Sequence, residues 1–176
     1  MSRAFVKEDD AGQAPIIPPR AALPSGVANY VTPPGLEQLR TELSDLEAER
    51  AKTEANREDE AERSRQLVIL NGRISALTSR ISSAKVIEPK EQPADEVRFG
   101  ATVTLRTISG GKKGFKRKFT IVGVDEASVE KGLIAFVAPI VKAIQGLKKG
   151  EQTNLPMGRG EEVIEVEEVS YDHGKE

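Results

Sequence analysis

A charged segment, EANREDEAERSRQ from Glu54 to Gln66, contains carboxylates and guanidinium groups but no large apolar side chain. A segment of this kind offers electrostatic contacts and cannot build a packed core of its own. Leucine-patterned sequence flanks it on both sides. Two interpretations remain open: the charges solvate the end of a longer element, or that end contacts a partner. We favour the contact.

A second stretch, GGKKGFKRKF, is the one dense cationic cluster of the sequence. Its cations could meet an acidic surface or RNA phosphates, with an affinity that depends on salt. A lysine-rich turn also protects the edge of a β-sheet from aggregation, so both roles stay open. The five candidate cations are Lys112, Lys113, Lys116, Arg117 and Lys118.

The composition excludes several classes of protein. The chain has 176 residues, of which 31% are charged and only 4% aromatic, so a base-stacking nucleic-acid platform is not expected. Without cysteine there is no disulfide framework, zinc ribbon or cysteine nucleophile. The lone histidine, His173, lies near the C-terminus and gives no support to histidine-based catalysis. A net charge of −2 argues against general polyanion binding, and no apolar run has the length of a membrane span.

Two apolar stripes flank the charged segment and predict a pair of helices, because their members recur at steps of three and four residues. Thr32 can cap the first helix, and the prolines that follow it suit a first turn. Neither helix is stable alone, so we expect an antiparallel hairpin, a short coiled coil, that reverses near residues 55–60. The stripes are Leu36, Leu39, Leu43 and Leu46, then Leu67, Leu70, Ile74, Leu77, Ile81 and Ala84.

Strand-like sequence begins at Val97 and continues almost to the C-terminus. Alternating apolar residues predict one buried face in the first strand, and they are Val97, Phe99, Ala101, Val103 and Leu105. Further strands are expected in FKRKFTIVGVDEA, in GLIAFVAP and on both sides of the PMGRG turn. Strict alternation in the last strand places Val169 on the face opposite Ile164 and Val166.

A short amphipathic helix is expected in IVKAIQGL, with Ile140, Ile144 and Leu147 on one side. The fold class is therefore α+β: a helical hairpin, then a small antiparallel sheet with one helix. We expect a proline-rich flexible tail, in which Ile16 and Ile17 could form a docking segment. The predicted divisions are the tail at 1–31, the hairpin at 32–85, a linker at 86–96, the sheet domain at 97–171 and a frayed end at 172–176.

The order of motifs resembles that of a known family. FGATVTL, IVGVDEA and GLIAFVAPIVKAIQGLKKGE follow the hairpin in the order found in the Gre transcription elongation factors, GreA and GreB. The resemblance covers Tyr30 to Tyr171. It implies an N-terminal coiled coil joined to an FKBP-like domain, and no enzymatic activity of the protein's own. It also implies a cytoplasmic, nucleoid-associated monomer that binds bacterial RNA polymerase at the rim of the secondary channel, with nascent RNA as a possible contact and no membrane partner.

In that family the tip of the coiled coil presents two acidic residues to the magnesium of the polymerase, where backtracked RNA is hydrolysed. Asp59 and Glu62 keep the family's Asp-x-x-Glu spacing, but the glycine, asparagine and tyrosine of its tip motif are missing. Each arm is about one heptad shorter than in the family, which removes roughly 10 Å of reach. We therefore expect weak or no stimulation of cleavage, no stably bound cofactor, and at most a shared magnesium ion.

Two alternatives remain: a true cleavage factor that uses Asp59 and Glu62, and an FKBP-like peptide-binding or isomerase module. The resemblance implies a polymerase contact at Val137, Ala138 and Pro139, although a proline there also simply begins a helix. The arginines of the charged segment, Arg57, Arg63 and Arg65, could touch the transcript. We favour helical pairs with Glu58 and Asp59 at a spacing of four residues.

Overall fold

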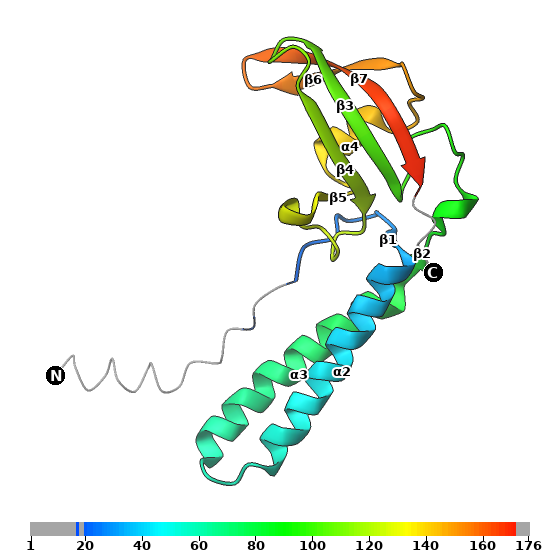
Figure 1. Ribbon diagram of the computed structural model, residues 1–176. Helices are drawn as coiled ribbons and strands as arrows, with labels where there is room; N and C mark the ends of the chain where they lie inside the picture. The colour runs from blue at the N-terminus through cyan, green and yellow to red at the C-terminus, as the bar shows by residue number, and fades with distance from the viewer. Residues whose placement is uncertain (1–16, 18–19, 172–176) are drawn as a thin grey trace, which may run out of the picture.

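Two long helices extend from one end of a five-stranded sheet (Figure 1). This computed structural model describes residue 17 and residues 20–171. The fold is α+β, as the sequence predicts. Residues 1–16 and 18–19 of the predicted tail, Ile16 among them, lie outside the described residues, as does the predicted frayed end at 172–176 with His173. No helix in the described part of the chain is both long and apolar enough to cross a membrane.

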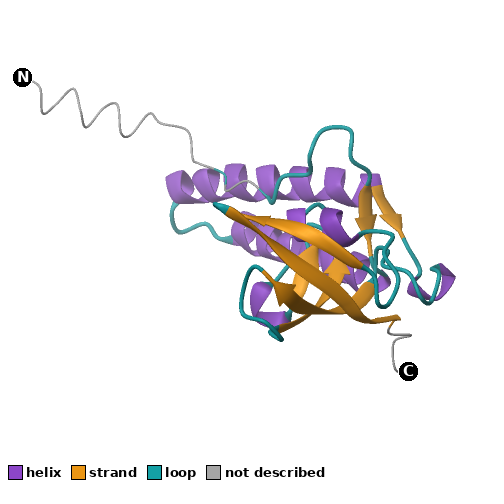
Figure 2. Cartoon of the chain, turned by 90° about the horizontal axis from the view of Figure 1, so that it is seen from above, coloured by secondary structure: helices purple, strands orange, loops and turns teal. Residues whose placement is uncertain are grey.

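The helices α2, Pro33–Ala55, and α3, Glu60–Ser83, lie side by side and are joined by residues 56–59 (Figures 1 and 2). The Oγ1 of Thr32 accepts the Gly35 N–H at 3.1 Å, so Thr32 caps α2 as predicted. The spacing of apolar residues also predicted the buried row between the helices. Its buried members are Leu39, Leu46, Leu70, Ile74 and Leu77.

A pair of short parallel strands closes the base of the helix pair. Strand β1, Asn29–Val31, pairs with β2, Ala84–Val86. The prediction that residues 1–31 form a flexible tail is therefore wrong for Asn29–Val31. The Asn29 side chain is buried and donates to the Arg80 carbonyl at 2.9 Å and to the Ser83 hydroxyl at 3.1 Å. Three-residue strands carry too little pattern to be recognised, and this pairing depends on packing against α3.

The larger sheet has the strand order β5-β4-β3-β7-β6. After β2, the 3₁₀ helix η1, Pro89–Glu91, leads to the sheet. All five alternating residues from Val97 to Leu105 are buried, as predicted. The strand itself begins only at Ala101, so Val97 and Phe99 lie before it. The bounds of the strands are Ala101–Ser109 for β3, Lys116–Val122 for β4, Leu133–Ala135 for β5, Gln152–Met157 for β6 and Gly160–Tyr171 for β7.

A six-residue helix, α4 at Pro139–Ile144, packs on the core of the sheet. Val141 and Ile144 are buried, whereas the predicted Ile140 and Leu147 are only partly buried against the same core. The sequence therefore located this helix but did not single out Val141.

The sheet is not purely antiparallel, which corrects the prediction. Strand β5 pairs with β4 in parallel, with Thr120 opposite Leu133 and Val122 opposite Ala135. Between them the chain forms the 3₁₀ helix η2, Val129–Lys131, and returns to run beside β4 in the same direction. The sequence does not reveal this parallel pairing, because β5 pairs with β4 through only three residues, which is too short for a recognisable pattern.

The face assigned to Val169 is also wrong. Thr104 lies opposite Glu168 but Leu105 lies opposite Val166, so Glu167 is an extra residue in β7. Such a β-bulge reverses the alternation beyond it. Val169 therefore packs on the same core as Ile164 and Val166.

Candidate functional site

The turn between α2 and α3 is held by the side chains at its two ends. The Asn56 N–H donates to the carbonyls of Lys52 and Thr53, both at 3.2 Å, and ends α2. The Asn56 Oδ1 accepts the Glu58 N–H at 3.0 Å. Asp59 has extended backbone angles and caps α3. Residues 56–59 thus form a defined reversal, placed where the charged sequence predicts it.

Of the two tip carboxylates, Asp59 caps α3 and Glu62 lies on its first turn, and both residues are exposed. One oxygen of each is already bonded. The Asp59 Oδ1 accepts the Glu62 N–H at 3.1 Å, and the Glu62 Oε1 accepts the Gln66 side-chain N–H at 2.9 Å. Both residues line a depression of about 240 Å³, together with Lys52, Thr53, Asn56, Arg63 and Gln66.

The depression has mixed charge, because Lys52 and Arg63 share it with the carboxylates. Arg63 donates to the Asn56 carbonyl at 3.2 Å and pairs with Glu60 at 3.4 Å. The predicted pair of Arg63 with Asp59 is therefore wrong, since Asp59 faces the helix end that it caps. Arg57 and Arg65 form no ion pair with any residue that the structure describes.

A magnesium ion prefers about six oxygen ligands in an octahedron. Within residues 17 and 20–171, no three Asp, Glu, His or Cys side chains gather closely enough to hold a metal ion. Asp59 and Glu62 supply two carboxylates, each with one oxygen engaged in a hydrogen bond.

The predicted contact turn at Val137, Ala138 and Pro139 precedes α4. Pro139 is exposed at the first position of this helix, while Val137 and Ala138 are half-buried. The Ala138 N–H donates to the Ala135 carbonyl at 2.9 Å, and its methyl side chain cannot cap the helix. Beginning α4 is thus a demonstrated role of Pro139, and its exposed ring leaves room for a contact.

The structure divides the predicted cationic cluster. Arg117 binds the buried carboxylate of Glu162 with Nη2 distances of 2.6 and 2.7 Å, and Lys116 pairs with Glu167 at 3.0 Å. The Arg117 guanidinium, followed by the Thr107 hydroxyl, lowers the pKa of Glu162 below its ordinary value. The remaining cations, Lys112, Lys113 and Lys118, are exposed.

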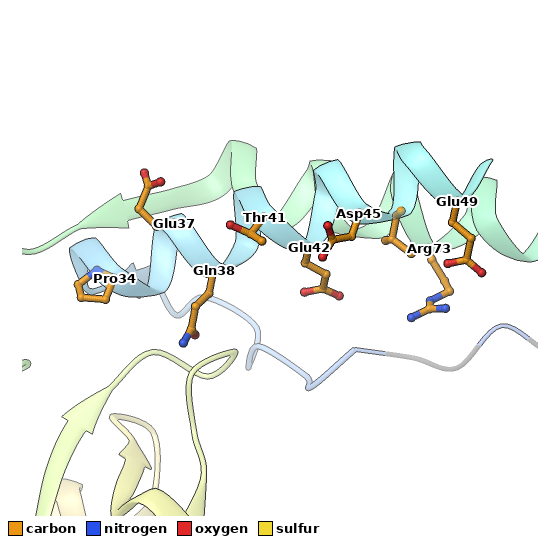
Figure 3. A pocket seen from close by; sticks show the side chains of 9 residues that line it. Pro34, Glu37, Gln38, Thr41, Glu42, Asp45, Glu49 and Arg73 are labelled. Carbon is orange, nitrogen blue, oxygen red and sulfur yellow. The ribbon is translucent and has the colours of Figure 1, made fainter. Parts of the chain in front are cut away.

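A groove of about 650 Å³ runs along the side of α2 and is lined mainly by acidic and polar side chains (Figure 3). Glu37, Asp45 and Glu49 project from α2, and Arg73 of α3 reaches the same groove. The excess of carboxylates disfavours phosphate binding at this flank of the helix pair.

The sequence analysis missed the residues that join the helix pair to the sheet. The Glu126 carboxylate accepts the Thr32 N–H at 3.1 Å and the Gly123 N–H at 3.0 Å, and it also accepts the Thr32 hydroxyl. A Cβ on Gly35 would overlap this carboxylate. Gly123 and Glu126 lie in IVGVDEA, which the sequence analysis used as a motif without assigning it a structural task.

Comparison with known proteins defines the class. Residues 92–171 match the family described as "Transcription elongation factor, GreA/GreB, C-term". "Transcription elongation factor GreA" of Acidiphilium cryptum is 35% identical over 155 residues, which covers 80% of this chain and 96% of that protein. The protein of that name from Desulfovibrio desulfuricans is 32% identical over 154 residues, covering 80% and 93%.

The alignment with the GreA of Nautilia profundicola, at 36% identity, covers 57% of this chain and 60% of that protein. Among solved structures, the GreA factor homolog 1 (Gfh1) of Thermus thermophilus is 20% identical, covers 84% of this chain and 100% of its own, and has a TM-score of 0.37. The chain belongs to the GreA/GreB family of transcription elongation factors.

Proposed function

We propose that this protein binds bacterial RNA polymerase at the rim of the secondary channel and modulates elongation or backtracking, with weak or no stimulation of transcript cleavage. The tip at residues 56–59 enters the channel, and the protein has no catalytic activity of its own. One observation carries this proposal: the Asp59 Oδ1 is committed to the cap of α3. The two carboxylates that would serve cleavage therefore stand in a mixed-charge, hydrogen-bonded tip.

The reach of the helix pair supports the same conclusion. Helix α2 has 23 residues, which at about 1.5 Å per residue is about 35 Å. If each arm is about one heptad shorter than in the family, as expected from the sequence, the tip lies about 10 Å short of the channel metal. Because carboxylates bind magnesium at about 2 Å, such a tip cannot touch the metal unless the protein seats deeper. Misplacement of even about 1 Å is costly in such chemistry.

The sheet domain, which we take to be FKBP-like, supplies the docking surface of this proposal. The Val137–Pro139 turn contacts the channel rim with apolar rather than hydrogen-bonding groups, because Ala138 has no polar side chain. The protein acts as a monomer in the bacterial cytoplasm, where the polymerase transcribes.

A second candidate function is full cleavage stimulation. It is favoured by one observation: Asp59 and Glu62 line the same depression and are both exposed. On this alternative, each carboxylate offers its second oxygen to the magnesium of the polymerase.

Transcript cleavage in stalled, backtracked polymerase separates the two candidates. The wild-type protein is compared with Asp59→Asn/Glu62→Gln, in which Asn preserves the helix cap and both charges are removed. Arg40→Gln, on the exposed flank of α2, is the matched control. We expect weak cleavage or none above background with all three proteins, together with competition against a GreA factor for the polymerase.

Rapid cleavage that the double variant abolishes and Arg40→Gln retains would establish the second candidate instead. Absence of competition would refute polymerase binding at this site. An FKBP-like isomerase function would appear as catalysed cis–trans exchange in a proline peptide, and we expect none.

A further inference from the structure

The segment that precedes α2 crosses the junction between the helix pair and the sheet (Figure 1). We call residue 17 and residues 20–31 the strap. Its last part is β1, which pairs with β2 at the base of the helices. Its first part lies against α3, where a Cβ on Gly72 would overlap the Ile17 side chain. The predicted docking segment therefore contacts this chain itself through Ile17.

Asp125 lies in the loop after β4, and its side chain is only 5% exposed. Its Oδ1 accepts Arg20 of the strap, at 3.3 Å from Nε and 3.2 Å from Nη2. Its Oδ2 accepts Arg80 of α3 at 3.0 Å. One carboxylate thus joins the strap, a helix and the sheet.

Both arginines make a further link. Arg20 donates to the two oxygens of Glu42 on α2, at 2.7 and 3.1 Å. Arg80 donates to the Ala21 carbonyl of the strap at 2.6 Å. The side chains of Arg20 and Arg80 are 21% and 14% exposed. Partly buried, hydrogen-bonded ion pairs of this kind are less screened by salt than surface pairs and fix geometry well.

An aromatic contact continues the same junction. The ring of Tyr30, in β1, lies 5.9 Å from Phe99 and 5.4 Å from Phe136, measured between centroids. Phe99 precedes β3, and Phe136 directly follows β5. Offset and tilted aromatic pairs at these distances are favourable. The strap is therefore bound to the sheet by both charge and apolar packing.

The length of the helix pair makes this junction consequential. An arm of about 35 Å that tilts by about 10° at its base moves its tip by about 6 Å. We propose that the strap sets the direction in which the α2–α3 tip points, with Arg20 and Asp125 as its positioning residues. The proposal rests on the proposed function only in assigning the tip a target; the direction itself is a property of the isolated protein.

The absence of cysteine from the sequence allows a direct test. Ser64→Cys on α3 and Gln152→Cys on β6 are both exposed positions, and each takes one spin label. Pulsed electron–electron double resonance then gives the distribution of distances between the label near the tip and the label on the sheet. The full-length chain with both labels should show one narrow distribution.

Arg20→Ala and Asp125→Asn are introduced separately, and Glu37→Gln is the control. Glu37 forms an exposed ion pair with Arg40 on α2 and makes no hydrogen bond or ion pair with the described residues of the strap. We expect Arg20→Ala and Asp125→Asn to broaden and shift the distribution, and Glu37→Gln to leave it unchanged. Arg20→Lys, which keeps the charge but loses the fork to Glu42, should fall between wild type and Arg20→Ala.

Thermal melting of each labelled protein identifies loss of folding. Should Asp125→Asn fail to fold, Arg20→Ala alone decides, because Arg80 still pairs with Asp125 in that variant. A folded Arg20→Ala protein with the wild-type distribution would overturn the proposal.

A second experiment, with RNA polymerase, distinguishes failure of this proposal from failure of the proposed function. Competition against a GreA factor is measured with the unlabelled wild type and Arg20→Ala. A broadened distance distribution without polymerase binding by the wild type would refute the proposed function and leave the strap proposal standing. An unchanged distance distribution in Arg20→Ala, together with polymerase binding by the wild type, would refute the strap proposal and leave the proposed function standing.

Discussion

The Glu126 carboxylate accepts the backbone N–H of Thr32 at 3.1 Å, so a loop of the sheet caps the first turn of α2. The first N–H groups of a helix have no partner within the helix and carry partial positive charge. Glu126 satisfies one of these groups and, through the Gly123 N–H, a loop amide of its own. One carboxylate thus links the start of α2 to the loop after β4 by hydrogen bonds.

Glu126→Ala should destabilise the protein by about 2 kcal/mol, because it leaves the Thr32 and Gly123 N–H groups without a partner. Urea unfolding monitored by circular dichroism measures the change. Glu126→Gln keeps one acceptor oxygen and should cost less. Equal stability of wild type and Glu126→Ala would contradict the role of this carboxylate.

Gly35→Ala should be destabilising in the wild-type protein although alanine favours helix. The new Cβ would displace the Glu126 carboxylate, which lies where it must go. In the Glu126→Ala background the obstacle is gone, and the same change should stabilise α2 by about 1 kcal/mol. Unfolding of the four proteins of this double-mutant cycle tests the reversal of sign. A destabilising effect in both backgrounds would show that Glu126 is not the obstacle.

Glu162→Gln should lower stability at neutral pH by about 2 kcal/mol, since the Arg117 guanidinium loses its charged partner. The pKa of Glu162 is lowered in the folded protein, by Arg117 first and Thr107 second. Its stabilisation is therefore complete above the unfolded value near 4.5 and is lost as the pH falls through the folded value.

Urea unfolding of wild type and Glu162→Gln at a series of pH values checks this. The difference in stability should be constant at neutral pH and shrink at acidic pH. A difference that grows on acidification would have the wrong sign for a lowered pKa. Arg106→Gln, which removes an exposed pair with Glu165, is the control and should have little effect.

Asp59→Ala should destabilise the tip by about 1 kcal/mol, whereas Asp59→Asn should change stability little, because both Asp and Asn cap helices. Amide hydrogen exchange of the first turn of α3 reports the effect locally. The Glu62 N–H, which Asp59 accepts, should lose protection in Asp59→Ala. Equal protection in all three proteins would mean that Asp59 is not a cap in solution.

The parts of the fold with a repeating pattern could be predicted from the sequence. Burial of Leu39, Leu46 and Leu77 follows from their spacing on a helix, and burial of Val103 and Leu105 from alternation on a strand. The position of the tip follows as well, because a segment without apolar side chains cannot continue the packed row. These features depend on neighbours close in sequence.

Features that depend on contacts between distant residues could not be predicted. Asn29 is buried because Arg80 and Ser83, more than fifty residues away, bind its amide. The bulge at Glu167 exists only relative to its partner strand. Asp125 lies in the part of IVGVDEA that follows β4, a loop sequence without periodicity. Its two arginine partners, Arg20 and Arg80, are distant in the sequence, so local pattern could not predict the contact.

The parallel pairing of Asn29–Val31 with Ala84–Val86 has a consequence for how the tip can change over evolutionary time. It places the entry and exit of the helix pair side by side, so both arms are anchored at one fixed base. An insertion or deletion in one arm alone would put its apolar row out of step with the other. Changes of length that are matched between the two arms keep the apolar rows in register and leave the base and the sheet unchanged. The length of the helix pair can therefore vary while the β1–β2 pairing at its base stays the same.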